Sequence, residues 1–153
     1  MTDPIFLDQV TPRLALPMLF AGQSQKEIFV NEALVRIDAL CHCIIEDEIA
    51  SPPASAPDGT AWLVGSGATG EWAGRDGAIA LRQLGQWQFS APVDGMRITN
   101  RATGQVIGRV DDAWVRPVAP QVPSGGATID IEARATIAEL IARLREAGIF
   151  AIA

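Results

Sequence analysis

The sequence predicts a mainly β protein, a small antiparallel barrel or sandwich with an amphipathic helix before it and a short helix after it. All four tryptophans (Trp62, Trp72, Trp87 and Trp114) lie in a glycine-rich middle segment. Three of them close a short turn phrase, as in Gly85-Gln86-Trp87, which is typical of the start of a short strand. On either side of this segment, apolar residues recur at helical spacing.

Residues 1–22 are predicted to form an apolar arm, because Pro4, Pro12 and Pro17 interrupt them and no helical period runs through them. We expect residues 14–20 to pack against their own domain or against a neighbouring molecule. The acidic residues before this run argue against a signal peptide. No stretch approaches the ~20 apolar residues that span a bilayer.

A helix is predicted within residues 23–50, running from about residue 24 to 43. Ser24-Gln25-Lys26-Glu27 matches a capping box, in which the serine and the glutamate satisfy each other's backbone amides. Residues 46–48 are all acidic, which is unfavourable at a helix C-terminus, so the helix should stop before them. The expected apolar stripe consists of Val30, Ala33, Leu34, Ile37, Leu40, Cys41 and Ile44.

Residues 51–119 form the predicted β-domain, which opens with a stiff proline-rich connection over 51–59. Ile79 alternates with Leu81, and Trp87 with Phe89, so one face of the sheet is expected to be buried. The strands are expected at 60–64, 78–84, 86–90, 96–100, 105–110 and 113–118.

The chain then passes through a linker at 120–129 to a second helix and tail at 130–153. Asp130 is a plausible N-cap, and Gly148 stands where a left-handed C-terminal cap belongs. An isolated helix of this length is marginal in water. Its narrow apolar stripe therefore needs a partner surface, either the β-domain of the same chain or another copy. That stripe consists of Ile137, Leu140, Ile141 and Leu144.

The charge balance limits the partners. The formal net charge is -6, so no basic surplus exists to neutralise phosphates, and neither nucleic acid nor an anionic membrane is expected to bind. Cys41 and Cys43 flank the single histidine, His42. In a helix, residues two apart do not share a face, and three ligands leave a tetrahedral metal site incomplete. We interpret the cysteines as small buried residues, and predict no metal and no cofactor.

Catalytic motifs are weak. Residues 65–70 satisfy the pattern G-x-G-x-x-G, but no helix can start comfortably after them, so a turn is favoured over a dinucleotide site. Asp58, Asp76 and Asp94 each precede glycine, where aspartate is a good turn residue. A carbohydrate-active enzyme would need paired carboxylates across a groove, and the sequence brings no such pair together. The chain is therefore predicted not to be an enzyme.

The tryptophans allow two interpretations. Most are expected to fill the core of so small a β-domain. Trp72 is the best candidate for exposure, because its neighbours are all small or polar. An exposed tryptophan would fit a carbohydrate-binding module that contacts host surface polysaccharide, which is the main alternative to a structural role.

Several phrases resemble one family. They include Leu14-Ala15-Leu16-Pro17, Pro52-Pro53, the glycine-rich residues 67–77 and the phrase at 85–89. Together they resemble an unknown-function domain found in spike and tail-fibre structural proteins of phages and gene transfer agents of alphaproteobacteria. The resemblance covers roughly residues 12–115 and implies no catalytic residues.

What the resemblance implies is a virion structural protein, a spike or fibre base or an adaptor that anchors a host-attachment appendage. Such a protein would lie on the virion surface after assembly in the bacterial cytoplasm. Its partners would be other copies of itself and capsid, tail or fibre proteins. The residues expected at partner contacts are Leu14, Leu16, Met18, Phe20, Trp72, Ile137, Leu140, Ile141, Leu144 and Phe150.

Overall fold

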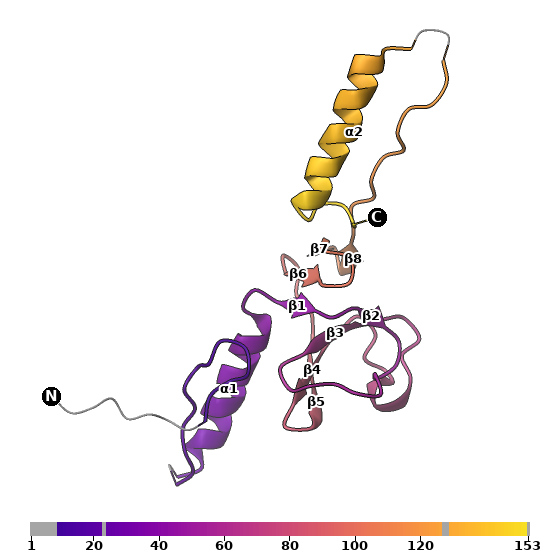
Figure 1. The fold of residues 1–153 in the computed structure, drawn as a ribbon. Helices are drawn as coiled ribbons and strands as arrows, with labels where there is room; N and C mark the ends of the chain where they lie inside the picture. Colours follow the sequence, from indigo (N-terminus) through magenta and orange to yellow (C-terminus); the bar gives the residue numbers. More distant parts are fainter. Residues whose placement is uncertain (1–8, 23, 127–128, 153) are drawn as a thin grey trace, which may run out of the picture.

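The computed structural model describes residues 9–22, 24–126 and 129–152. The first eight residues of the predicted arm, Gln23 of the predicted capping region, linker residues 127–128 and Ala153 lie outside the described residues. The described chain is mainly β, with two sheets of four strands each and one helix toward each end (Figure 1). Neither sheet closes on itself, so the barrel alternative is wrong.

The first helix, α1, spans Lys26–Leu40 and ends before the acidic residues, as predicted. The predicted capping box is wrong. Gln25 is the N-cap, in a left-handed conformation with φ of 64°, and it makes no side-chain capping bond. Glu27 instead accepts a hydrogen bond from the backbone N–H of Gly22, at 3.2 Å. The carboxylate is therefore used to hold the end of the arm against the first turn of α1.

The buried face of α1 also differs from the predicted stripe. Val35, Asp38 and Ala39 are buried, whereas Val30 and Ile37 of the stripe are exposed. The reason is that the arm packs on α1 and donates hydrogen bonds to Asp38, so this charged residue is buried. The predicted stripe and the buried face therefore lie on different sides of this helix.

Asp38 is the anchor of the arm and is 2% exposed. Its carboxylate accepts the Thr11 hydroxyl at 2.8 Å and the backbone N–H groups of Leu14 and Arg13 at 2.6 and 3.1 Å. The Arg13 guanidinium donates to the carbonyls of Ala39 and His42, both at 3.0 Å. These carbonyls lie at the end of α1, where helical partners run out. The arm thus packs on its own domain, one of the two predicted alternatives.

The chain next crosses between the two sheets through two strands that the sequence analysis missed, β1 (Ile44–Ile45) and β2 (Glu48–Ile49). Each pairs in parallel with a later strand, β1 with β6 and β2 with β3, and each has only two residues, too few for a visible period. The sheet orders are β1-β6-β7-β8 and β2-β3-β4-β5. The remaining strands are β3 (Ala61–Val64), β4 (Ile79–Gln83), β5 (Gln86–Ser90), β6 (Arg97–Asn100), β7 (Val106–Val110) and β8 (Ala113–Val115).

All six predicted strands are confirmed, with ends within three residues of those expected. The expectation of one buried face is wrong for β4, in which Ala80 is buried as well as Ile79 and Leu81, and for β3, in which all four residues are buried. Successive strand residues point to opposite faces, so both faces of β3 are covered. Leu63 packs in a core with α1 and the first sheet, whereas Trp62 and Val64 pack in a second cluster on the other side.

The second helix, α2, spans Ile131–Glu146 and has the predicted caps. The Asp130 carboxylate accepts the N–H of Ala133 at 2.9 Å. At the other end, Gly148 takes a φ of 72° and its N–H donates to the Arg145 carbonyl, while Ile149 donates to Leu144, both at 2.9 Å. This pair of bonds is a Schellman motif, and it turns the tail back toward the sheets.

Gln105 ties α2 to the β-domain. Its buried amide donates to the carbonyls of Pro117, before the linker, and Ile149, after the helix. The Val106 N–H also donates to Gly148 at 2.7 Å. The segment before α2 and the segment after it are therefore both fixed at the start of β7. The helix α2 projects away from the sheets, beside the extended segment that leads to it (Figure 1).

Candidate functional site

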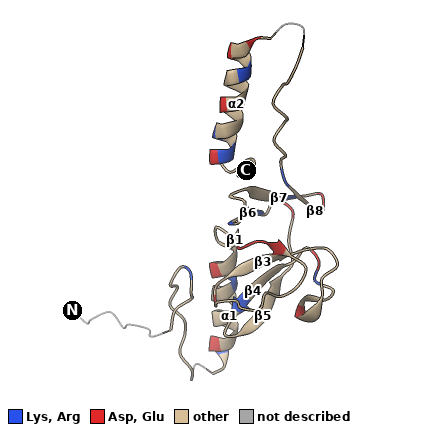
Figure 2. Cartoon of the chain, turned by 45° about the vertical axis from the view of Figure 1, so that its right-hand side comes forward, with Lys and Arg blue, Asp and Glu red and all other residues tan. Residues whose placement is uncertain are grey.

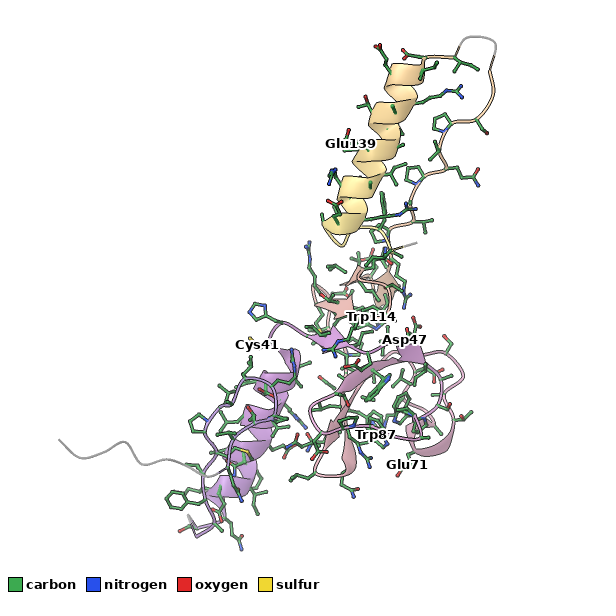
Figure 3. All side chains as sticks on the ribbon, in the orientation of Figure 1. Cys41, Asp47, Glu71, Trp87, Trp114 and Glu139 are labelled. Atoms are coloured by element: carbon green, nitrogen blue, oxygen red, sulfur yellow. The ribbon has the colours of Figure 1, made fainter. Side chains whose placement is uncertain are left out.

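The tryptophans form a closed cluster. Trp72 is 0% exposed, so the prediction of an exposed Trp72 is wrong. Its ring meets Trp87 edge to face at a centroid distance of 5.0 Å, and Trp87 meets Trp62 in the same way at 5.6 Å. Figure 3 places Trp87 among the side chains at the second sheet. A sugar cannot stack on the Trp72 ring in this fold.

The small neighbours of Trp72 explain the wrong prediction. Trp72 ends a single turn of 3-10 helix over Gly70–Trp72, and the glycines on either side, Gly67, Gly70 and Gly74, take positive φ values that glycine adopts without strain. Gly70 has a φ of 63°, and a side chain there would contact the Pro52 ring at 3.5 Å. The small residues therefore form a thin cover over the aromatic cluster rather than an open platform.

The glycine-rich loop is a turn, as predicted. The Asp76 carboxylate accepts the backbone N–H groups of Gly67 and Ala68 at 2.8 and 3.0 Å. These two hydrogen bonds lower the pKa of Asp76. A bound phosphate would need backbone amides of this kind, but a carboxylate of the chain itself already occupies these two.

The other aspartates that precede glycine also hold turns. Asp58 accepts the N–H of Gly85 at 3.2 Å, and Asp94 accepts the N–H of Asp112 at 3.1 Å. The first of these bonds joins residues 27 apart in the sequence, and the second joins residues 18 apart. These two side chains therefore fix one loop against another. The turn interpretation of Asp58, Asp76 and Asp94 is confirmed.

The Cys-His-Cys phrase does not form a metal site within the described part of the chain. Cys41 is exposed, so its interpretation as a small buried residue is wrong, whereas Cys43 is buried, as predicted, in the core between α1 and the sheets. Over residues 9–22, 24–126 and 129–152, no group of three or more His, Cys, Asp or Glu side chains could hold an ion. In the same ranges, no helix is long and apolar enough to cross a membrane.

Burial gives the two cysteines different reactivity. Desolvation raises the pKa of the Cys43 thiol from 9.0 to about 11. We expect a thiol reagent at pH 8 to modify one cysteine, Cys41, in the folded protein and two after unfolding. Cys41→Ser should therefore show no rapidly reacting thiol. Rapid titration of two thiols in the folded wild-type chain would contradict the burial of Cys43.

The sign of the pH dependence follows from the same shift. Between pH 9 and about 11 the unfolded chain ionises Cys43 and the folded chain does not. Stability contributed by the neutral thiol is thus present below pH 9 and is lost as the pH rises through this window. Cys43→Ala should show a smaller fall in stability over the same pH range.

A shallow groove lies on the outer face of the first sheet, with a volume of about 370 Å³. Its lining includes Met96, Arg97, Val106, Val115 and Ile149, so strands β6 to β8 and the tail after α2 all contribute. The remaining tryptophan, Trp114, faces the opposite side, where its indole N–H donates to the Gly77 carbonyl at 2.9 Å and joins the two sheets. Arg97 and Arg109 are the charged residues of this lining, and the other lining residues are apolar or glycine.

The predicted contact residues of α2 are only partly open. Leu140 is 58% exposed and Ile137 is also exposed, whereas Ile141 is 5% exposed and Leu144 and Phe150 are half-buried. The side of α2 that carries Ile141 therefore packs within its own chain. The neighbouring side of the helix presents apolar side chains to solvent.

A second apolar surface lies at the N-terminal end of α1, which projects from the opposite end of the molecule (Figure 1). Asn31 exchanges two 2.8 Å hydrogen bonds with the backbone of Leu19, which holds Phe20 beside the first turns of α1. Phe20 is exposed and Phe29 is 74% exposed. The exposed apolar residues of this α1 end are Phe20, Ile28, Phe29 and Val30.

Phe20 was among the predicted contact residues, whereas Phe29 and Ile28 were missed, because the predicted apolar stripe of this helix began at Val30. Among the other arm residues, Leu14 is exposed, Leu16 is half-buried, and Met18 packs against the core cluster of its own chain. Met18 is therefore largely used inside the molecule rather than at a partner contact.

A family model described as a protein of unknown function, DUF2793, matches residues 30–115, more than half of the chain. The chain belongs to the DUF2793 family. A search of curated proteins found no match. The DUF2793 segment contains both sheets and the whole tryptophan cluster. The whole arm, the first turn of α1 and all of α2 lie outside it, so the two exposed apolar ends flank the family's core.

Proposed function

We propose that this DUF2793 protein is a structural component of a phage-like particle, such as a gene transfer agent. It acts as a spike or fibre base, or as an adaptor that anchors a host-attachment appendage. The observation that carries the proposal is the pair of apolar surfaces at opposite ends of the molecule, one at the α1 end and one on α2. Soluble monomers seldom expose large contiguous apolar surfaces, and such surfaces mark contact sites.

An adaptor needs two contact surfaces and a rigid body between them. The body here is the pair of sheets, whose cores contain no residue of α2. Gln105 and the Schellman motif fix α2 to this body, and Asp38 and Arg13 fix the arm at the other side. One end would dock on a capsid or tail protein and the other on a further copy or a fibre protein, at the virion surface after cytoplasmic assembly.

The buried Trp72 weakens the carbohydrate-binding alternative, which depended on that ring. The glycine-rich loop does not support an enzymatic role either, because the Asp76 carboxylate already accepts the amides of Gly67 and Ala68. Asp58 and Asp94 likewise hold loops rather than form a catalytic pair. The resemblance of residues 12–115 to spike and fibre domains supports the virion role.

Deletion of residues 124–153 tests the proposal. Because both core clusters lie outside this segment, we expect the truncated protein to keep its folded β-domain, as judged by circular dichroism and cooperative unfolding. We expect its incorporation into purified particles to fall to background. The full chain carrying Leu84→Glu, at a leucine that is 77% exposed and lies on neither surface, should be incorporated normally. Normal occupancy by the truncated protein would contradict the role of α2.

A further inference from the structure

We propose that the open side of α2 binds the α2 of a second copy of this chain, with the two helices antiparallel. This inference rests on the structural role proposed above and names the partner of one of its two surfaces. It follows from the spacing, the sizes and the charges of the side chains along the helix.

The spacing matches a helix–helix seam. Apolar residues stand at alternate intervals of four and three, which is the pattern of a coiled-coil seam. The side chains near the middle of this seam are open, since Leu140 is 58% exposed and Ile137 is also exposed. The seam consists of Ala133, Ile137, Leu140, Leu144 and Ala147.

The sizes favour an antiparallel pair. When two copies of α2 overlap along their full length in opposite directions, Ala133 lies opposite Leu144 and Ile137 lies opposite Leu140. The smallest side chain of these four then faces a large one, which fills the seam evenly. A parallel pair would place Ala133 opposite Ala133 and leave a gap at that level.

The charges point the same way. The N-terminal turn of α2 carries Asp130 and Glu132, as the red far end of the helix in Figure 2 illustrates. The last turn carries Arg143, Arg145 and Glu146, of which Glu146 pairs with Arg143, so this turn keeps one net positive charge. An antiparallel pair brings each acidic turn beside the basic turn of the other copy and opposes the two helix dipoles. Residues 131–146 contain three glutamates and three arginines, so this helix is neutral in a chain of net charge -6.

The length of the helix sets the expected strength. Sixteen residues make a helix about 24 Å long. A contact of this length is small beside the roughly 800 Å² per partner of a stable interface. The contact should therefore form a weak dimer that depends on protein concentration, and that many copies on one particle would reinforce.

Sedimentation equilibrium of the full chain tests the contact. We expect the mass to rise from that of one chain, 16.3 kDa, toward twice that value as the concentration approaches about 1 mM, the weak end of specific association. Leu140→Glu should weaken dimerisation at least tenfold, because it places a charge in the seam. Leu84→Glu is the matched control, the same change at an exposed leucine away from α2, and should dimerise as the wild type does.

Cysteine cross-linking tests the orientation in a Cys41→Ser background. A mixture of chains carrying Ala133→Cys and Leu144→Cys should form a disulfide-linked heterodimer, whereas Ala133→Cys alone should not cross-link. Efficient cross-linking of Ala133→Cys with itself would overturn the antiparallel arrangement. A monomeric wild type at every concentration, or a Leu140→Glu variant that dimerises normally, would overturn the contact itself.

These results are separable from those for the proposed function. A monomeric chain whose truncation still abolishes incorporation would leave the particle role intact and assign α2 to another protein. A dimer that depends on Leu140, in a chain whose truncated form enters particles normally, would support the contact between helices and contradict the role of α2 in incorporation.

Discussion

Replacing Trp72 by alanine should lower the free energy of unfolding by about 3–5 kcal/mol, the largest effect expected of any single substitution in this chain. The indole is fully buried and packs edge to face against Trp87. Its removal leaves a cavity beneath the thin cover formed by the glycine-rich loop, and the edge-to-face contact is lost as well. Chemical denaturation monitored by far-UV circular dichroism measures the loss.

Two further variants make this result specific. Trp72→Phe should cost less than about 2 kcal/mol, because phenylalanine keeps most of the apolar contact. It also removes an indole N–H that has no hydrogen-bond partner in the described structure. Leu84→Ala, at an exposed site in the turn between β4 and β5, should change stability by less than about 0.5 kcal/mol. A Trp72→Ala variant as stable as Leu84→Ala would contradict the burial of the ring.

Replacing Asp38 by alanine should lower the free energy of unfolding by about 3 kcal/mol. The carboxylate is buried and accepts three hydrogen bonds from the arm. Its loss leaves the Thr11 hydroxyl and two backbone N–H groups without their acceptor in a dry site. The arm should also detach from α1, which limited proteolysis would reveal as rapid cleavage near residues 13–20.

Glu32→Ala is the matched control on the same helix. Glu32 forms an exposed ion pair with Arg36 at 2.8 Å, and such pairs contribute less than about 1 kcal/mol. It should leave both stability and proteolysis of the arm nearly unchanged. Equal destabilisation by Glu32→Ala and Asp38→Ala would show that the arm is not held by the buried carboxylate.

The sequence predicted the parts of the fold that depend on local chemistry. The strands around Gly85 and around Thr103-Gly104 follow from turn residues and alternation, and both caps of α2 follow from Asp130 and Gly148. The aspartates at 58, 76 and 94 lie in turns, as expected of an aspartate that precedes glycine. The amides that their carboxylates accept belong to residues outside those turns, and these partners were not predictable from the sequence.

Features that depend on contacts distant in sequence were not predictable. Asp38 reads as a solvent-facing residue until Thr11 and Arg13 come beside it. The two-residue strands β1 and β2 exist only because β6 and β3 offer edges for them. Trp72 was predicted to be exposed from its small neighbours, whereas those neighbours allow the loop to close over it.

The candidate contact surfaces were likewise predictable only where they depend on local sequence. On α2, periodicity identified Leu140 and Ile137, but which side of the helix its own chain covers depended on the fold. At the α1 end, Phe29 is exposed but was missed, because the predicted apolar stripe began one residue later, at Val30. An exposed phenylalanine in the first turns of an amphipathic helix was the available signal.

The most direct test of the structural role is to locate the chain in a density map of purified particles. We predict density for the two sheets at the particle surface, with α2 of one copy against α2 of another and the α1 end against a capsid or tail protein. Particles that lack this density, from cells in which the full-length chain is abundant in the soluble fraction, would contradict the role.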